Sequence, residues 1–324
     1  MRSLRLLHLI QRYYPFQGGS ERYFQSISEW FAAAGHTVDV LTTDAWDLEY
    51  FWDRSARHSQ PLETKHQGVR ITRVPVHHLP LARFSHRAIR RLMAESSRAG
   101  FPGKLPLLRA GSRFGPWLPE LETVATQLGA RADLINSANI AFESMITVAE
   151  RVARRSDVAH VVTPFVHLGE GRSSKVRRYY TMPHQIELLR RADAVIVLTA
   201  LERDTLIELG VDGRHVQIAG AGIDRARSTG GNGATARASL HETRPLVLAL
   251  GAAAYDKGTL HLVEAVSRLN RAGTEVALVV AGPILRDFQR FADELSEQDR
   301  RNLHVLGFIS EDEKRDLLAA ADIL

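Results

Sequence analysis

The chain has 324 residues, of which 44% are apolar and 24% are charged, and its formal net charge is +5. These proportions are typical of a globular protein and exclude a disordered, fibrous or membrane-spanning chain. The sequence contains no cysteine, which excludes disulfides, thiolate metal sites and a cysteine nucleophile and suits a reducing cytoplasm. Its length predicts two domains, and neither a signal peptide nor a membrane-spanning segment is expected.

Short apolar runs alternate with helical patterns along the chain, which is typical of a parallel sheet covered by helices on both faces. The predicted fold class is therefore α/β. In the first part of the chain, strands are expected at residues 4–10, 37–43, 69–74, 132–136, 159–164, 194–199 and 215–220. Residues 224–243 are small, polar and rich in glycine, and they predict a connector between two domains. After the connector, strands are expected at residues 245–251, 276–282 and 303–308.

Several helices have starts that can be predicted from capping residues. A helix is expected to begin at Gly19 and Ser20, and another covers residues 259–271. Two more helices are predicted from capping boxes, one formed by Thr199 with Glu202 and the other by Ser310 with Glu313.

The end of the sequence repeats a pattern from its first part. Residues 188–199 pass from a helix through Ala192 and Asp193 into a strand, and residues 317–324 follow the same order up to the first residues of a strand. Only three strands are expected between the connector and this point. We therefore expect the second domain to be incomplete relative to its fold.

Two loops place glycines immediately before a predicted helix, where backbone N–H groups and the helix dipole favour an anion. In the first loop these are Gly18 and Gly19; in the second, Gly258 follows Lys257. A lysine at that position opposes the helix dipole unless an anion such as a phosphate lies between them. The alternatives are a glycine-containing helix cap without a ligand and a solvated surface lysine. The glycine spacing differs from a dinucleotide fingerprint, which argues against a nicotinamide-dependent oxidoreductase.

His167 follows the strand expected at residues 159–164, at the carboxyl end where open α/β sheets bind ligands. It is a candidate site residue, and an ordinary surface histidine is the alternative. The sequence lacks the HExxH motif, paired-carboxylate spacing and the Gly-x-Ser-x-Gly motif, which argues against zinc hydrolysis and serine catalysis.

Positive charge is concentrated between residues 83 and 113, where eight arginines and lysines stand against one glutamate. Apolar residues alternate with these charges, which favours a basic amphipathic segment on anionic lipid headgroups or on a phosphorylated acceptor. The candidate contact residues are Arg87, Arg90 and Arg91. A solvated helix face is the alternative, and nucleic acid is disfavoured because no binding motif accompanies the charges.

Five segments, taken in order, resemble the family 4 glycosyltransferases. They are residues 12–43, 192–211 with 218–224, 256–269, 278–283 and 302–324. The resemblance implies the GT-B fold, in which two Rossmann-like domains face a cleft. Residues 1–222 would form the acceptor-side domain and residues 223–324 a partial nucleotide-sugar-binding domain.

The family transfers a sugar from a nucleotide-diphosphate donor with retention of anomeric configuration. The resemblance implies that Lys257 neutralises the departing diphosphate and that His167 lies beside the reacting sugar. The implied donor-binding residues are Gly18, Gly19, Gly251, Gly258, Gly282, Pro283, Phe308 and Ile309. No cofactor or metal is expected, so Lys257, helix dipoles and backbone donors would meet the developing charge.

The sequence also departs from the family. Ala252 stands where the family usually has an arginine, and residues 220–222 are Gly-Ala-Gly instead of Pro-Asn-Gly. The segment that would carry two glutamates spaced eight apart, expected to hold the donor's ribose and sugar, would follow Asp322. The alternative is therefore a noncatalytic remnant or partner subunit, and we expect no turnover from this chain alone.

The resemblance implies a donor nucleotide sugar and a glycan, lipid-linked or small-molecule acceptor in polysaccharide or glycolipid assembly. We expect a cytoplasmic location with peripheral contact at the inner face of the plasma membrane, and no nucleic acid partner.

Overall fold

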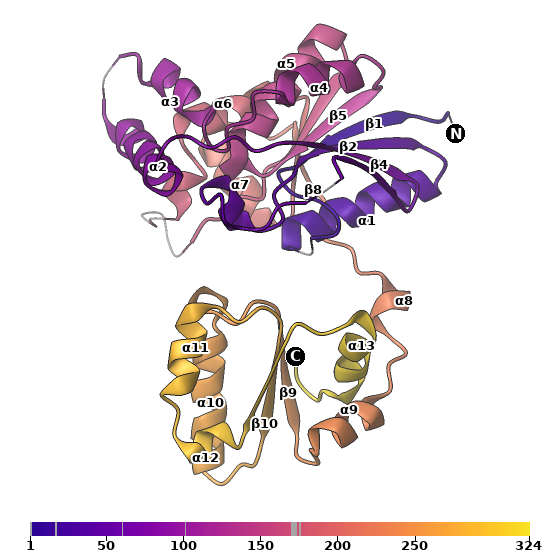
Figure 1. Cartoon of the computed structure of the whole chain (residues 1–324), viewed down its shortest axis with the longest axis vertical. Helices are drawn as coiled ribbons and strands as arrows, with labels where there is room; N and C mark the ends of the chain where they lie inside the picture. The colour runs from indigo at the N-terminus through magenta and orange to yellow at the C-terminus, as the bar shows by residue number, and fades with distance from the viewer. Residues whose placement is uncertain (1, 17, 60, 101, 170–173, 175) are drawn as a thin grey trace. The chain divides into compact units, whose positions relative to one another are not determined.

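The structure is a computed structural model of the whole chain, and it describes residues 2–324 except 17, 60, 101, 170–173 and 175. The described residues form two compact units, Met1–Ala221 (unit 1) and Gly222–Leu324 (unit 2). Each is an α/β unit built on its own sheet (Figure 1). Within the described residues, no helix combines the length and the apolar character that crossing a membrane requires.

Unit 1 contains an eight-stranded sheet in the order β3-β4-β2-β1-β5-β6-β7-β8. Its strands are β1 (Arg5–Leu9), β2 (Thr37–Thr43), β3 (Glu63–His66), β4 (Val69–Val74), β5 (Leu134–Ala138), β6 (Ala159–Thr163), β7 (Ala194–Val197) and β8 (Val216–Ile218). All pairs are parallel except β3 with β4. The strand order reverses at β1, which lies between β2 and β5, and such a reversal is where open α/β sheets bind ligands.

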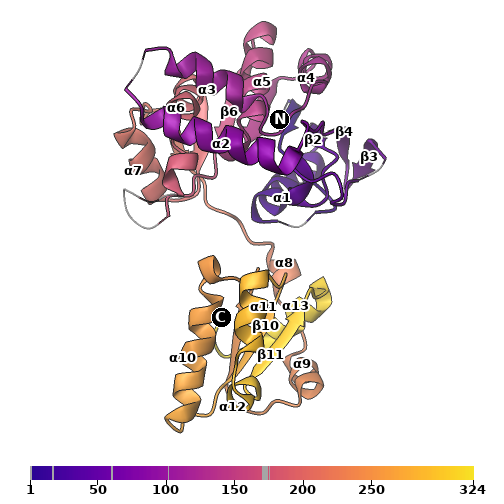
Figure 2. The ribbon, with the colours of Figure 1, turned by 60° about the vertical axis from the view of Figure 1, so that its left-hand side comes forward.

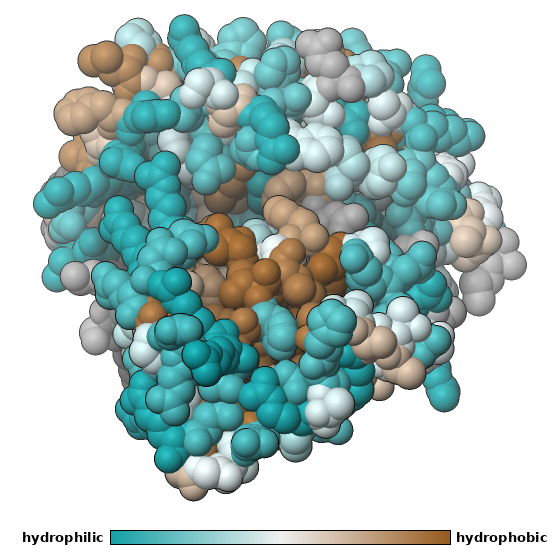
Figure 3. Space-filling model, turned by 60° about the horizontal axis from the view of Figure 1, so that its bottom comes forward, coloured by the Kyte–Doolittle hydropathy of each residue, from teal (hydrophilic) through white to brown (hydrophobic). Residues whose placement is uncertain are grey.

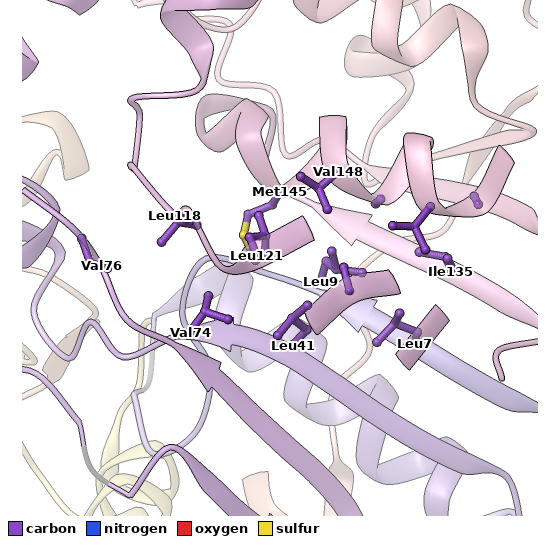
Figure 4. Packing of buried hydrophobic residues seen from close by; sticks show 14 of the residues in the cluster. Leu7, Leu9, Leu41, Val74, Val76, Leu118, Leu121, Ile135, Met145 and Val148 are labelled. Carbon is purple, nitrogen blue, oxygen red and sulfur yellow. The ribbon is translucent and has the colours of Figure 1, made fainter. Parts of the chain in front are cut away.

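Helices cover both faces of this sheet. The helices of unit 1 are α1 (Gly19–Ala33), α2 (Ala82–Arg98), α3 (Lys104–Ser112), α4 (Leu121–Gly129), α5 (Glu143–Ser156), α6 (Pro183–Arg191) and α7 (Ala200–Glu208). Side chains alternate along β1, so that Leu7 packs toward α4 and α5 whereas Leu6 packs toward α1. Figure 4 shows the first of these clusters, with Leu41 of β2 facing Met145 of α5. The α/β class predicted from the alternating pattern is confirmed.

Unit 2 contains a three-stranded parallel sheet in the order β11-β10-β9. Its elements are β9 (Leu246–Leu250), β10 (Ala277–Ala281), β11 (Leu303–Gly307) and the helices α8 (Arg225–Ser228), α9 (Gly233–Leu240), α10 (Thr259–Arg271), α11 (Arg286–Asp293), α12 (Glu297–Arg300) and α13 (Glu311–Ala320). One sheet face packs against α9 and α13 and the other against α10 and α11, as Figures 1 and 2 show.

The expected connector at residues 224–243 contains two helices, α8 and α9, and lies within unit 2, where α9 packs on α13. The glycines serve packing: a Cβ on Gly231 would lie 2.1 Å from the Arg315 carbonyl oxygen, and one on Gly233 would lie 2.5 Å from that of Ala319. These glycines therefore let the start of α9 approach α13 closely, and Ala236 is buried there.

The last residues of the chain pair with the edge of the unit 2 sheet. Ile323 forms a parallel bridge with Val247, and the Leu248 amide donates to the Ile323 carbonyl oxygen at 2.8 Å. An isolated bridge therefore lies where the sequence predicted the first residues of a strand. Ile323 and Leu324 are 60% and 77% exposed. Figure 3 shows one patch of apolar side chains near the middle of a mostly hydrophilic face.

Candidate functional site

The carboxyl ends of the three strands in unit 2 bring three glycines together. The Gly251 amide donates to the Ala281 carbonyl oxygen at 2.9 Å, and the Gly282 amide donates to that of Gly307 at 2.7 Å. Gly282 has φ +140°, and a Cβ there would lie 2.0 Å from the Gly251 carbonyl oxygen. Only glycine fits this approach, so it lets the backbone after β10 lie close to the backbone after β9.

The loop that follows β9 is fixed by its neighbours. The Ala253 amide donates to the Pro283 carbonyl oxygen at 2.8 Å, and the Leu285 amide donates to the Ala253 carbonyl oxygen at 3.1 Å. The Tyr255 amide donates to Asp287 at 2.8 Å, and this hydrogen bond lowers the pKa of the Asp287 carboxyl. The loop therefore has a defined shape where it reaches α10.

Lys257 and Gly258 stand at the N-terminus of α10. Gly258 has φ +74°, a conformation that favours glycine, and no side chain caps the helix. The Lys257 side chain is exposed, and none of the described residues forms a hydrogen bond or ion pair with its ammonium group. A cation beside an uncapped helix N-terminus can hold an anion such as a diphosphate.

The loop after β11 completes this edge. Phe308 is 82% exposed, whereas Ile309 is half-buried and packs against the cluster beneath α13. Ser310 caps α13 by accepting from the Glu313 amide at 3.1 Å, which confirms the predicted capping box. The structure thus brings all the predicted unit 2 residues to one edge of the sheet: Gly251, Lys257, Gly258, Gly282, Pro283, Phe308 and Ile309. Ala252 there is half-buried and uncharged.

In unit 1, the loop with Gly18 and Gly19 joins β1 to α1 at the reversal of strand order. A Cβ on Gly18 would lie 2.3 Å from a carboxylate oxygen of Glu21, whereas one on Gly19 would meet no atom within 4 Å. Glu21 is buried and accepts from Gln11 at 3.0 Å and from Arg12 at 3.1 Å. Burial lowers the pKa of the Arg12 guanidinium, against the opposing effect of Glu21. A buried ion pair therefore holds the loop in place.

Two further residues that hold this loop were not predicted. Gln25 donates to the Phe16 carbonyl oxygen at 2.7 Å, and Arg73 donates to that of Tyr14 at 2.8 Å. Both side chains are buried. Two signals in the sequence could have indicated these residues. Gln25 lies on the apolar face of a predicted helix, and Arg73 takes an inward position on a predicted strand.

His167 lies beyond the carboxyl end of β6, as predicted, and is exposed. The segment that carries it packs on α1, because the Phe165 ring lies 5.5 Å from Tyr23 and 6.2 Å from Phe24. The His167 ring lies 4.9 Å from that of Tyr180. Unit 1 therefore brings the His167 segment beside the helix that begins at the glycine loop.

The three candidate contact arginines of α2 differ in their surroundings. Arg87 and Arg91 are exposed, whereas Arg90 points inward and donates from Nη1 to both carboxylate oxygens of Glu143, at 2.8 and 3.0 Å. Its charge is therefore already partnered inside the protein, unlike those of its two neighbours.

Two family models match the sequence: a glycosyl transferase 4-like domain over residues 18–222 and a glycosyl transferases group 1 domain over residues 234–324. The chain belongs to the glycosyl transferase 4-like family. The resemblance inferred from the sequence is therefore confirmed. No curated protein matches the chain in sequence.

The structures similar to this glycosyltransferase share its fold at low identity. The HepE protein of Anabaena, in complex with UDP and glucose, has a TM-score of 0.63 at 15% identity over 98% of this chain and 73% of its own. Sucrose-phosphate synthase of Thermosynechococcus elongatus has a TM-score of 0.63 at 17% identity over 99% and 74%. An α,α-trehalose-phosphate synthase of Burkholderia xenovorans, in complex with glucose-6-phosphate, has 0.58 at 15% over 98% and 76%. The α/β fold of this enzyme is the GT-B fold.

Among the described residues of this glycosyltransferase, no group of three or more histidines and carboxylates could hold a metal ion. What the carboxyl edge of unit 2 offers instead is the exposed cation of Lys257, an uncapped helix N-terminus and the backbone at three glycines. These groups suit an oligophosphate ligand.

Proposed function

We propose that this glycosyltransferase moves a sugar from a nucleotide-diphosphate donor to a glycan, lipid-linked or small-molecule acceptor, with retention of anomeric configuration. The observation that carries the proposal is the position of Lys257 directly before the uncapped N-terminus of α10. There the ammonium group and the helix dipole would together neutralise the charge that develops on the diphosphate.

The other residues of the same edge would bind the rest of the donor. Gly251 and Gly258 let the diphosphate approach the backbone, and Gly282 with Pro283 shapes the pocket. The exposed ring of Phe308 and the backbone at Ile309 would contact the base. A Cβ on Gly251 or Gly258 would meet no atom within 4 Å, and the aromatic ring of Phe308 is exposed at the end of β11, which supports this assignment.

The acceptor would bind mainly to unit 1, with His167 near the reacting face of the sugar and Gly18 and Gly19 facing the diphosphate. In the retaining step, the bond between the anomeric carbon and the phosphate oxygen breaks, and its electron pair stays with the diphosphate. The acceptor oxygen bonds to the same face of the sugar, and its proton passes to the departing phosphate. The proposal requires no metal ion, so a chelator should leave turnover unchanged.

The proposed location is the cytoplasm, with peripheral contact at the inner face of the plasma membrane and a role in surface glycan or polysaccharide assembly. The absence of cysteine and the basic helix α2, which exposes Phe84 and Leu92, support it. No nucleic acid is proposed as a partner.

A donor-consumption assay over uridine, guanosine and adenosine diphosphate sugars tests the proposal, run on the chain extended by the segment that the family carries after Asp322. Lys257→Ala should lower turnover about tenfold or more, since it removes a cation from the leaving group. Arg268→Ala is the matched control, because it removes an exposed cation from the last turn of the same helix. Equal activity of Lys257→Ala and the control would contradict the role of Lys257. Donor binding without turnover would favour the noncatalytic alternative, for which Ala252 is the supporting residue.

A further inference from the structure

The outer face of α2 exposes apolar and cationic side chains side by side. Phe84 and Leu92 are 73% and 59% exposed, and Arg87 and Arg91 are exposed between them. Phe84, Arg87 and Arg91 follow spacings of three and four residues, and Leu92 comes eight residues after Phe84, so the four side chains lie on one side of the helix. Leu81, which precedes the helix, is 81% exposed. We call Phe84, Arg87, Arg91 and Leu92 the outer face.

The opposite side of α2 is held firmly by the rest of unit 1. Met93 and Ala94 are buried with Leu108 of α3 and Met182, and Arg90 pairs with the fully buried Glu143. Figures 1 and 2 show α2 beside α3 at the surface of unit 1. Because the inner side is occupied, rotation of α2 cannot bury the outer face within unit 1.

The cations of this region differ in whether a carboxylate already neutralises them. Arg83 pairs with Asp53, and Arg98 lies 3.7 Å from Glu95. Among the described residues, no hydrogen bond or ion pair involves the guanidinium groups of Arg87 and Arg91. The unneutralised charge of α2 therefore lies on the same face as its exposed apolar side chains.

We propose that the outer face of α2 is an interfacial surface for an anionic lipid bilayer. Arg87 and Arg91 would bind lipid phosphates, while Phe84 and Leu92 enter the boundary between headgroups and acyl chains. Arg90 takes no part in lipid binding, because its charge is used to anchor the helix. The inference rests on the proposed peripheral location, and it adds which residues make the contact.

The exposed aliphatic side chains favour a bilayer over nucleic acid. Leu81 and Leu92 lose contact with water when they enter hydrocarbon, but they have no hydrogen-bonding or stacking partner on a nucleic acid. Binding to nucleic acid would depend on the arginines and on stacking of bases against Phe84. The two partners therefore differ in whether Leu81 and Leu92 contribute.

Vesicle cosedimentation tests the surface without depending on catalysis. The 324-residue chain is mixed with vesicles of phosphatidylcholine alone or with phosphatidylglycerol added, at low and high salt. We expect binding only to the anionic vesicles, weakened by salt. The double variant Arg87→Glu with Arg91→Glu should reduce the partition coefficient about tenfold or more, because it reverses two charges at the bilayer. Phe84→Ser should weaken the binding that persists at high salt.

A control on α11 has the same spacing and charge change. Arg286 and Arg290 are exposed and lie four residues apart, so Arg286→Glu with Arg290→Glu should leave vesicle binding unchanged. Equal loss in both double variants, or no preference for anionic vesicles, would overturn the proposal. So would binding to an oligonucleotide that depends on Arg87 and Arg91 while vesicle binding does not. Since vesicles contain no donor, failure here would leave the proposed glycosyl transfer untouched.

Discussion

Arg90 of α2 and Glu143 of α5 form an ion pair in which the carboxylate is fully buried and both of its oxygens accept from the same Nη1 atom, at 2.8 and 3.0 Å. Gln185 also donates to Glu143 at 2.7 Å, and His184 lies 3.3 Å away. Burial alone would raise the pKa of Glu143, but Arg90 and His184 outweigh it, so the pKa lies below its ordinary value. The pair attaches the basic helix to the core.

Arg90→Met should therefore destabilise the protein strongly. Removing the arginine leaves a buried carboxylate without its cation, which costs about 3–5 kcal/mol in the free energy of unfolding. Urea unfolding measures this loss of stability. Arg87→Met is the matched control on the same helix, and as an exposed substitution it should change stability by less than about 0.5 kcal/mol. Similar stabilities for the two variants would show that the pair does not anchor α2.

The two loop glycines of unit 1 should respond differently to alanine. Gly18→Ala places a methyl group against Glu21 and the ring of Phe16, at 2.3 and 2.7 Å, and should destabilise the protein by about 1–3 kcal/mol. Gly19→Ala meets no atom within 4 Å and should leave the thermal unfolding temperature unchanged. If Gly19 faces the donor, the same substitution in the extended chain should nevertheless lower turnover. Full activity of Gly19→Ala would remove that residue from the donor site.

Gly282→Ala should disturb the candidate donor edge of unit 2. Its Cβ would lie 2.0 Å from the Gly251 carbonyl oxygen, and its φ of +140° is strained for alanine. We expect a lower unfolding temperature and weaker nucleotide binding. Gly273→Ala also has a positive φ but no atom within 4 Å of the added Cβ, so it should keep nucleotide binding. Intact nucleotide binding in Gly282→Ala would contradict the close contact between Gly282 and the Gly251 carbonyl oxygen.

Stability should fall as the pH drops from about 6.5 to 4, because burial lowers the pKa of His8, His86 and His160 to about 4. The unfolded chain takes up protons at an ordinary pKa of about 6.5, so acid favours unfolding by up to about 1.4 kcal/mol per pH unit for each histidine. Urea unfolding at several pH values tests this. His160→Gln should flatten the profile, whereas the exposed His261→Gln should not. A profile without slope in the parent protein would refute the prediction.

Patterns of apolar residues and helix caps predicted most elements of the fold. The expected strands at residues 37–43 and 69–74 match β2 and β4 to the residue, as the expected helix at 259–271 matches α10. Strand β3 was not predicted, because Glu63–His66 has no apolar alternation and is ordered by pairing with β4. Helix α9 was missed because its small residues are typical of linkers and become helical through packing on α13.

For the candidate site, the sequence predicted where a residue lies wherever that residue directly follows a strand or precedes a helix. Gly251, Gly282 and Phe308 follow three neighbouring parallel strands, so they had to meet at one edge. The inward direction of Arg90 could not be predicted, because it depends on Glu143, which lies 53 residues away on another helix. Long-range polar pairs of this kind leave no local pattern in the sequence.

The most direct test of the account is to locate nucleotide binding on the chain by backbone amide NMR. Uridine, guanosine and adenosine diphosphate are titrated in turn into the 324-residue chain and into Lys257→Ala. We expect one of them to shift the amides of Gly251 and Gly258 saturably, and Lys257→Ala to weaken this binding about tenfold. Shifts from none of the three, or shifts confined to the hollow lined by Arg237 and Arg244 at the other end of the sheet, would contradict this expectation.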